Sequence, residues 1–362
     1  MGKTATLANI GSVADSSLGF RNRIINGAMV IDQRNAGASV TPTVDQYIVD
    51  RWFARITNAS KLSFQQSSTA PSNFIKSTLI TSLSSYSVAS TEHFGYNQAI
   101  EGFNISDLNW GTASAATVSL SFSVRSSLTG TFGGMLTNSS GTRSYVFSYT
   151  INSANTFENK TVTIAGDTSG TWLTDNGQGI TVSFSLGAGS SVSTTAGSWN
   201  GSLYRNVTGG TSVVGTSGAT FYITGVQLEK GSTATSFDYR PYGTELALCQ
   251  RYCNVFTNSD STNQRHSTFA MASATTVVDS AFSFKTSMRT APSIVIDTIG
   301  NIRLSDGITA TTPTAYAILG AVNGSQQGLV SFTATGLTAF RPYFVEANGT
   351  LNSAKITFSA EL

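Results

Sequence analysis

Apolar and polar residues alternate along much of the chain. Between Thr117 and Val124, valine, leucine and phenylalanine alternate with threonine and serine, and residues 145–151, 180–186 and 354–362 repeat this period of two. Successive side chains of a β-strand point to opposite faces, so such a period is typical of a strand that is buried on one face. The pattern therefore predicts a chain built mainly of β-strands.

Clusters of glycine, serine, asparagine and aspartate separate the predicted strands. Asn176-Gly177 and Asn348-Gly349 can supply the positive φ angles of tight hairpin turns. Many short strands with few helices between them are typical of β-sandwiches rather than of α/β folds. We also find no internal repeat of about 20–50 residues, which argues against solenoids and propellers.

One short helix is predicted between Thr244 and Tyr252, because Gly243 and Thr244 can begin it and Glu245 lies in its first turn. A helix within a β-rich chain commonly marks a hinge between domains, so we place the domain boundary just after it. The predicted parts are an extended N-terminal arm (1–40), a large β-sandwich domain that ends in the helix (41–253) and a smaller C-terminal β-sandwich (254–362).

Residues 20–34 differ from the predicted strands, since arginine residues surround a short apolar stretch. As a free terminus this segment would fray, whereas laid on a neighbouring subunit it would be ordered. We interpret it as a docking arm. The residues predicted to make the docking contact are Arg21, Arg23, Ile24, Ile25, Met29 and Arg34.

The composition narrows the classes of function. Only 11% of the 362 residues are charged, and the net charge is +2. Nucleic-acid binding through a basic face needs clustered lysine and arginine, which this chain lacks. A hydrophobic content of 40% excludes disorder, and no apolar run of about 18 residues predicts insertion into a membrane. Surface polarity must come from serine, threonine, asparagine and glutamine.

The two cysteines do not indicate a disulfide or a metal site. Cys249 and Cys253 lie four residues apart in a segment interpreted as helical, where a disulfide would be strained and would close too short a loop to stabilise much. Zinc would need further ligands, and the only histidines are His93 and His266, far away in the sequence. We therefore predict two free thiols.

Several longer motifs resemble the sequences of tailed-phage tail-fibre and virion appendage proteins. They are RIINGAM (23–29), DQR (32–34), DRWF (50–53), FYITGVQLEKG (221–231) and SFDYRP (236–241). The resemblance implies a virion structural protein, usually a homotrimer, with a jelly roll similar to carbohydrate-binding modules. It also implies that other virion proteins bind the N-terminal arm.

Aromatic residues in polar loops are the candidates for sugar contact, because sugar rings present apolar faces while amide and hydroxyl groups bind their hydroxyls. Trp199 and Tyr204 lie in a stretch rich in glycine, serine and threonine, and they rank first. Trp172 and Trp110 follow. Subunit packing is the alternative role for these residues, and Trp52, in an alternating strand, is assigned to the core.

No catalytic residue is predicted. Glycoside hydrolysis needs two opposed carboxylates, whereas Asp167 and Asp175 lie in turn clusters. His93 and His266 are interpreted as surface or half-buried histidines rather than as bases, and neither Gly-x-Ser-x-Gly nor His-Glu-x-x-His is present. No cofactor or metal is predicted either. Jelly rolls of the resembled kind often hold calcium, for which possible oxygen ligands are Asp45, Asp50, Glu101 and Asp238.

The sequence thus predicts a homotrimeric phage virion protein that is not an enzyme. Our first hypothesis is a tail fibre or receptor-binding protein in which linked copies make multivalent contacts to host surface glycans. The alternative is a capsid decoration or head-fibre protein that stabilises or ornaments the shell. A polysaccharide depolymerase is the third hypothesis.

Overall fold

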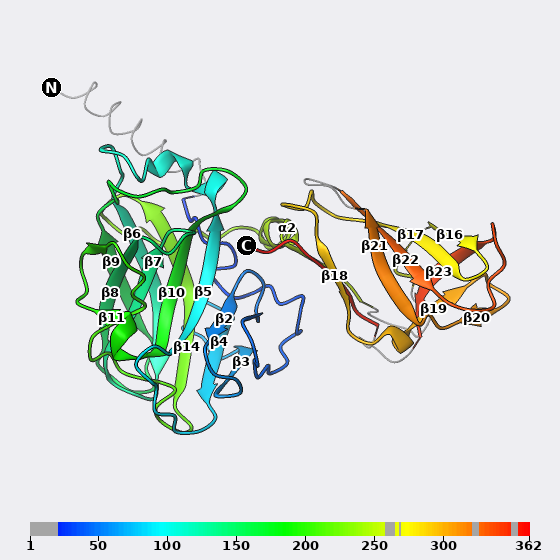
Figure 1. Ribbon diagram of the computed structural model, residues 1–362. Helices are drawn as coiled ribbons and strands as arrows, with labels where there is room; N and C mark the ends of the chain where they lie inside the picture. The colour runs from blue at the N-terminus through cyan, green and yellow to red at the C-terminus, as the bar shows by residue number, and fades with distance from the viewer. Residues whose placement is uncertain (1–20, 258–264, 268, 321–325, 349–353) are drawn as a thin grey trace. The chain divides into compact units, whose positions relative to one another are not determined.

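The computed structural model describes residues 21–257, 265–267, 269–320, 326–348 and 354–362. The chain divides into two compact units, Met1–Pro241 and Tyr242–Leu362 (Figure 1). Both units are built of antiparallel sheets, which confirms the predicted all-β fold. Within the described residues, no helix is both long enough and apolar enough to cross a membrane.

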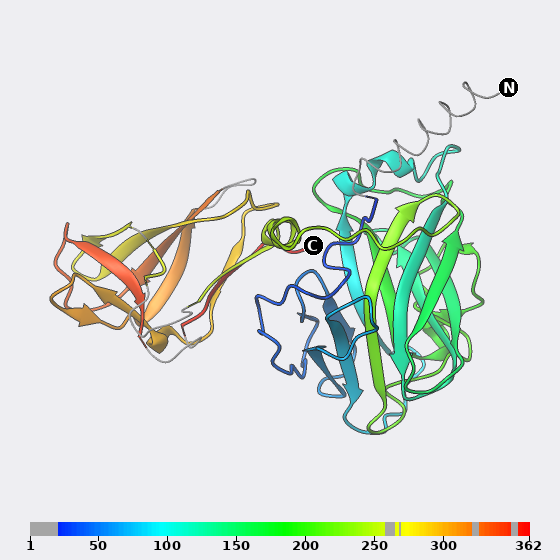
Figure 2. The ribbon, with the colours of Figure 1, turned by 180° about the vertical axis from the view of Figure 1, so that it is seen from behind.

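The first unit is a jelly-roll sandwich of two sheets that lie face to face (Figure 1 and Figure 2). The seven-stranded sheet contains, in spatial order, β1 (Gln46–Tyr47), β2 (Phe53–Ile56), β5 (His93–Glu101), β10 (Gln178–Ala188), β7 (Gly130–Thr137), β8 (Ser144–Ile151) and β12 (Trp199–Asn200). The five-stranded sheet contains β3 (Leu62–Ser67), β4 (Ser77–Ser82), β14 (Thr220–Lys230), β6 (Val118–Ser126) and β9 (Glu158–Ile164). A short parallel pair is formed by β11 (Ser193–Thr194) and β13 (Asn206–Val207).

The core of the first unit lies between its two sheets and follows the predicted alternation. Phe122 of β6 packs edge-to-face on Phe184 of β10, with 4.9 Å between the ring centroids. Trp52, predicted to be a core residue, is completely buried and stacks on Tyr96 at 5.2 Å. Because the apolar residues of β6 point inward, the serine residues between them are left for the outer face of the five-stranded sheet.

The segment interpreted as a docking arm is part of this unit from residue 21 onward. Ile24 and Met29 are completely buried and Ile25 is 6% exposed. The backbone N–H of Arg23 donates to Leu228 O at 2.8 Å, which fastens the segment to β14. The docking assignment of Ile24, Ile25 and Met29 is therefore corrected, since these side chains fill the core of their own unit and present no surface to a neighbour.

The arginines of this segment also have partners within the unit. Arg23 pairs with Asp107 at 2.6 Å, and Arg34 lies 3.9 Å from Asp50. The backbone N–H of Arg21 donates to a carboxylate oxygen of Asp238 at 3.0 Å. A docking role for the three arginines stays a prediction, and residues 1–20 of the predicted arm lie outside the described residues.

The second unit begins with α2 (Tyr242–Gln250) and continues as a smaller sandwich. One sheet contains β15 (Cys253–Phe256), β24 (Ile356–Ser359) and β18 (Ser293–Ile296). The other contains β20 (Ala310–Thr311), β19 (Ile302–Ser305), β23 (Pro342–Ala347), β16 (Phe269–Ala274), β17 (Val277–Ser283), β22 (Gln327–Thr333) and β21 (Ala315–Gly320).

Short 3-10 helices occur in both units. In the first unit they are η1 (Gly102–Asn104), η2 (Ser106–Leu108) and η3 (Ser190–Val192), and in the second unit η4 (Ile299–Asn301).

The helix belongs to the second unit, whereas the sequence places it at the end of the first. The residues after α2 explain the difference, because Tyr252 O accepts the backbone N–H of Ala360 at 2.8 Å and ties the end of the helix to the last strand. Cys249 and Cys253 are buried and are not joined to each other by a disulfide, in agreement with the prediction. Phe282, Phe332 and Phe358 form the centre of this second core.

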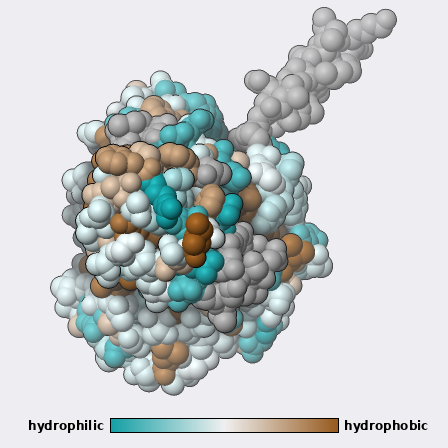
Figure 3. All heavy atoms as spheres, turned by 90° about the vertical axis from the view of Figure 1, so that its right-hand side faces the viewer, coloured by the Kyte–Doolittle hydropathy of each residue, from teal (hydrophilic) through white to brown (hydrophobic). Residues whose placement is uncertain are grey.

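The surface agrees with the low content of charged residues. Most atoms on the face in Figure 3 are pale, which marks residues of intermediate hydropathy, and the strongly apolar atoms form separate patches. With 21 Lys and Arg and 19 Asp and Glu among 362 residues, charge cannot cover such a surface. The polarity of the surface is therefore carried chiefly by uncharged side chains.

Candidate functional site

The three tryptophans predicted to bind sugar form one cluster in the first unit. The rings of Trp110, Trp172 and Trp199 meet edge-to-face, with centroids 4.8, 5.3 and 5.4 Å apart. Each indole N–H donates to a backbone carbonyl, and the acceptors are Ala116, Ser169 and Ala165 respectively. The cluster is thus a small satellite core that fixes the loops at this end of the sandwich.

This burial changes the assignment of the predicted sugar-binding residues. Trp110 is 6% and Trp172 is 7% exposed, so neither offers a ring face to a ligand, and both predictions are corrected. Trp110 and Trp172 are buried because they pack on each other and on Trp199, which β12 brings beside Tyr145 of β8. Trp199 and Tyr204 are half-buried, and for them sugar contact stays a prediction.

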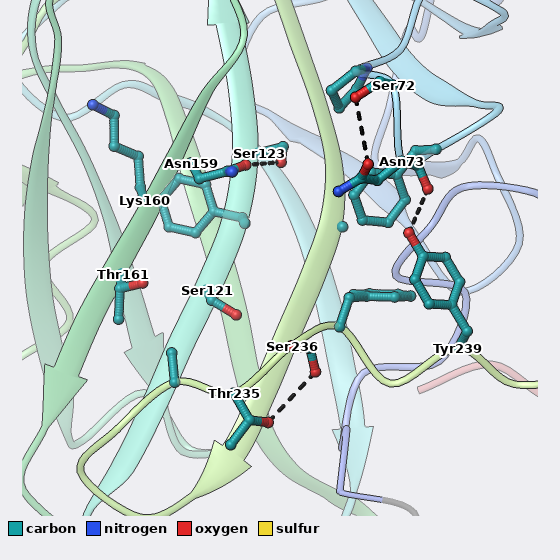
Figure 4. A pocket seen from close by; sticks show the side chains of 16 residues that line it. Ser72, Asn73, Ser121, Ser123, Asn159, Lys160, Thr161, Thr235, Ser236 and Tyr239 are labelled. Atoms are coloured by element: carbon teal, nitrogen blue, oxygen red, sulfur yellow. Dashed lines mark hydrogen bonds between the residues drawn. The ribbon is translucent and has the colours of Figure 1, made fainter.

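A pocket of about 530 Å³ opens on the outer face of the five-stranded sheet, away from this cluster (Figure 4). Its floor is formed by β6 and β14, and β9 forms one side. The opposite side is formed by the loop between β3 and β4 together with the segment that follows β14. Figure 4 shows the polar side chains of β6 and β9 facing the aromatic side of the pocket across its floor.

Phe74, Phe237 and Tyr239 form the aromatic side of the pocket, which we call the aromatic corner. The centroids of Phe74 and Phe237 are 5.0 Å apart, and those of Phe237 and Tyr239 are 4.8 Å apart, both in edge-to-face geometry. Phe74 and Tyr239 lie 5.6 Å apart. Tyr239 is 58% exposed, so the corner presents a ring to solvent while its neighbours hold that ring in place.

Gly225 allows the aromatic corner to lie directly on the sheet. It has a φ of +62° and lies in a β-bulge between Thr224 and Gln227 of β14. A Cβ at this position would lie 2.5 Å from Cζ of Phe74. Only glycine combines this backbone angle with the space that the ring occupies, so the sequence at the bulge determines the depth of the pocket.

Two buried polar residues of β14 position the segment that carries Phe237 and Tyr239. Glu229 accepts hydrogen bonds from the backbone N–H and the hydroxyl of Thr235, both at 2.7 Å. Gln227 accepts the backbone N–H of Asp238 at 2.8 Å. Because these bonds are made by buried side chains in a strand, the segment is fixed before any ligand arrives.

The other side of the pocket offers uncharged hydrogen-bonding groups. Ser121 and Ser123 point outward from β6, and Asn159 and Thr161 do so from β9. The hydroxyl of Ser123 donates to the side-chain oxygen of Asn159, which leaves the amide nitrogen of Asn159 as a donor toward the pocket. Such groups can donate and accept hydrogen bonds with the hydroxyls of a ligand.

The hydroxyl of Tyr239 is a fixed donor at the rim. It donates to the backbone oxygen of Asn73 in the loop between β3 and β4. Burial raises the pKa of the Tyr239 hydroxyl above its ordinary value, so the group stays protonated and keeps this bond. The bond joins the two segments that make up the aromatic corner.

The carboxylates considered as calcium ligands do not form a common site among the described residues. Asp45 pairs with Arg55 at 3.2 Å, Asp50 accepts a hydrogen bond from Gln33 at 2.7 Å, and Asp238 accepts the backbone N–H of Arg21. Across the described ranges, no group of three or more His, Cys, Asp and Glu residues is placed to hold a metal ion.

Both histidines are held neutral by burial. Desolvation lowers the pKa of His266 to about 4, and it lowers that of His93 to about 4 with help from the nearby Arg205 and Arg55. The backbone N–H of His266 donates to Val345 O at 2.8 Å, and its Nε2 is buried without a partner among the described residues. These imidazoles are structural groups whose protonation opposes folding.

We therefore expect the second unit to lose stability as the pH falls from about 6.5 to about 4. In that range the unfolded chain binds a proton at His266 and the folded chain does not, so the free energy of unfolding falls by up to about 3 kcal/mol. The measurement is calorimetric unfolding of the full chain between pH 7 and pH 4, with His266→Gln as the comparison. A variant that retains the same decline would contradict this origin.

The aromatic corner was not predicted, although the sequence around its residues carries the same signal that singled out Trp199. Phe74 lies in a stretch of serine, threonine, asparagine and proline, just as Trp199 lies in a polar stretch, but only tryptophans and Tyr204 were considered. Phe237 and Tyr239 lie within the SFDYRP motif, which was used for the resemblance and not examined for a site. If every aromatic residue of a polar segment counts as a candidate for sugar contact, Phe74, Phe237 and Tyr239 are all candidates.

The fold and the pocket define a jelly-roll β-sandwich with an open, largely uncharged surface site. No protein-family model matches the chain, and neither does any curated protein. Solved structures with low similarity include a putative sugar binding protein from Bacteroides thetaiotaomicron, which is 13% identical with a TM-score of 0.33, and the match covers 58% of this chain and 100% of that one.

Two further structures show likeness at the same level. One is a family 11 carbohydrate-binding module from Clostridium thermocellum in complex with a β-1,3-1,4-mixed-linked tetrasaccharide (10% identity, TM-score 0.29, 57% of this chain and 100% of that chain). The other is the enzymatically active domain of tailspike protein 4 of bacteriophage CBA120 (10% identity, TM-score 0.29, 58% and 21%). At this distance these likenesses carry no argument about function.

Proposed function

We propose that the first unit binds carbohydrate in the pocket on its five-stranded sheet. One observation carries the proposal, which is that an exposed aromatic corner faces a row of uncharged hydroxyl and amide groups across a pocket of about 530 Å³. A sugar ring has C–H faces that pack on aromatic rings and hydroxyls around its edge that need both donors and acceptors. The two sides of this pocket match those two requirements.

The electrostatics of the pocket favour binding over hydrolysis. No Asp or Glu is among the residues that line it, and hydrolysis would need two opposed carboxylates. Lys160, the charged residue of the lining, pairs with Glu158 at 2.6 Å. We accordingly propose a binding protein rather than a depolymerase.

The biological role that we propose is a phage tail fibre or receptor-binding protein on the virion. The support for it is the resemblance of residues 23–34, 50–53 and 221–241 to tailed-phage appendage proteins. Homotrimerisation would link three such pockets, so that weak single contacts with host surface glycans combine into firm attachment. A capsid decoration protein with the same pocket is the alternative, and localisation on phage particles by antibody labelling separates the two.

Replacing Tyr239 with alanine is expected to weaken glycan binding at least about tenfold, because the exposed ring of the aromatic corner is lost. The full chain is first applied to an array of bacterial surface polysaccharides, and the best ligand is then titrated by calorimetry. Tyr242→Ala is the matched control, since Tyr242 is similarly exposed and lies in the second unit. We expect this control to bind like the unmodified chain.

Trp199→Ala in the same titration distinguishes the pocket from the tryptophan cluster. Loss of binding with Trp199→Ala, and none with Tyr239→Ala, would move the site to the cluster. If no polysaccharide on the array binds the chain, the proposal of carbohydrate binding fails altogether. Full binding by both variants would likewise exclude the aromatic corner as the site.

A further inference from the structure

A second feature lies beside the pocket on the same face of the five-stranded sheet. Arg125 follows Ser123 by two residues in β6, so it points to the same side, roughly 7 Å further along the strand. Its guanidinium lies 4.9 Å from the ring centroid of Tyr222 and 5.9 Å from that of Phe157. Tyr222 is the direct cross-strand partner of Arg125 in β14.

Two rings, those of Tyr222 and Phe157, pack against the guanidinium from adjacent directions. Phe157 and Tyr222 are in edge-to-face geometry, with 6.1 Å between their centroids, and all three side chains are half-buried. A guanidinium packed against aromatic rings keeps its charge while losing part of its hydration. We call Arg125, Tyr222 and Phe157 the arginine cradle.

No counter-ion for the cation of the cradle is found among the described residues. Within the described part of the chain Arg125 makes no ion pair, and its Nε is buried without a hydrogen-bond partner. Lys160 in the neighbouring pocket differs, because Glu158 neutralises it at 2.6 Å. An arginine that is partly desolvated and unpaired attracts an anion more strongly than a hydrated one.

We infer that the ligand of this face is a carboxylated glycan, whose carboxylate pairs with Arg125 while a neighbouring sugar occupies the pocket. The inference rests on the proposed function of the pocket and specifies the class of sugar. A planar carboxylate can accept two parallel hydrogen bonds from a guanidinium fork. The short separation of Arg125 and Ser123 along one strand lets adjacent sugars of a single chain reach the cradle and the pocket together.

The test is an array of bacterial polysaccharides on which every acidic polysaccharide is printed twice, once native and once with its carboxyl groups chemically reduced to hydroxymethyl groups. The full chain is expected to bind the native form of its ligand about tenfold more tightly than the reduced form. Arg125→Gln should abolish this difference, so that the native and the reduced forms bind the variant equally. Lys61→Gln is the matched control, because Lys61 also lies over an aromatic ring, that of Tyr86 at 4.7 Å, elsewhere in the unit.

Salt provides a readout that needs no variant. Raising sodium chloride should weaken binding of the native form toward that of the reduced form, because exposed charge pairs are screened. Tryptophan fluorescence reports whether Arg125→Gln folds. If it does not fold, the salt dependence of the unmodified chain decides whether a carboxylate is recognised. Arg125→Lys then tests whether a positive charge alone restores part of the preference for the native form.

The outcomes separate the two claims. Equal binding of native and reduced forms, insensitive to salt, overturns the carboxylate inference and leaves carbohydrate binding intact. A preference for sulfated or phosphorylated polysaccharides that survives carboxyl reduction also overturns it. Absence of all binding overturns the proposed function and the inference with it.

Discussion

Replacement of Trp110 by alanine is expected to lower the free energy of unfolding of the first unit by about 3–5 kcal/mol. The indole is 6% exposed and contacts both Trp172 and Trp199 edge-to-face. Its removal leaves a cavity that the two remaining rings cannot fill, because each is fixed by its own hydrogen bond to a backbone carbonyl. The carbonyl of Ala116 also loses the N–H donor of Trp110.

Urea unfolding of the full chain followed by tryptophan fluorescence measures this effect in the first unit alone. All four tryptophans of the chain, Trp52, Trp110, Trp172 and Trp199, lie in that unit, so the second unit is silent. Trp199→Ala provides the comparison, since the half-buried ring of Trp199 should cost less than that of Trp110. A loss of under about 1 kcal/mol for Trp110→Ala would show that the cluster is not a core.

The result also bears on the assignment of the pocket. A tryptophan cluster that stabilises loops should affect unfolding and leave glycan affinity unchanged, whereas the aromatic corner should do the reverse. Because Tyr239 is 58% exposed, its removal forfeits little packing. The two sets of variants therefore separate stability from binding within one sandwich.

Local patterns predicted the elements of the fold well. The alternation of residues 180–186 corresponds to part of β10 (Gln178–Ala188), and the helix expected between Thr244 and Tyr252 is α2 (Tyr242–Gln250). Such patterns depend on neighbours a few residues away, which the sequence displays directly. The second sandwich was likewise expected from alternation in the C-terminal third of the chain.

The pocket could not be predicted in the same way. Its aromatic corner joins Phe74 to Phe237 and Tyr239, which are far apart in the sequence, and it depends on a bulge at Gly225 that no local pattern reveals. The arginine cradle likewise requires the register that places Arg125 opposite Tyr222. Local alternation gives the face of each side chain, but the strand order that unites them is a property of the whole sheet.

The same limitation explains the error about the N-terminal segment. Its apolar residues have no partner nearby in the sequence, so a docking arm was the natural interpretation. The structure shows that the partner is β14, since Val226 N donates to Gly27 O at 3.0 Å. A Cβ on Gly27 would lie 2.1 Å from Val226 O, so this close approach requires glycine.

Two of the resembled motifs are therefore parts of one structure. The guanidinium of Arg240, in SFDYRP, donates to the backbone oxygens of Ile24 and Asn22 beside RIINGAM. Asn22 in turn donates its side-chain amide to Val226 O at 3.0 Å. The motifs fasten the N-terminal segment to the strand that leads into the aromatic corner, so damage to the first motif should unfold the unit that holds the pocket.

Asn26 is the centre of this N-terminal fastening, and Asn26→Ala is expected to cost about 3–5 kcal/mol. The completely buried side chain accepts the N–H of Ile31 at 3.0 Å and donates to the carbonyls of Ile31 and Asp50 at 2.8 and 3.0 Å. Alanine leaves these buried groups without partners, each at a cost of about 1–3 kcal/mol. Asn26 also has a φ of 57°, a left-handed conformation that alanine adopts less readily.

Asn155→Ala separates the backbone contribution from the hydrogen bonds. Asn155 has a φ of 58° and lies in an exposed turn. Asn155→Ala therefore removes a residue suited to the left-handed conformation, but it breaks no buried network of hydrogen bonds like that of Asn26. Urea unfolding followed by tryptophan fluorescence should show a loss of about 1 kcal/mol for the control and several times that for Asn26→Ala. Equal losses would mean that backbone conformation, and not the buried network, accounts for Asn26, and the RIINGAM segment would then contribute little to holding the sandwich together.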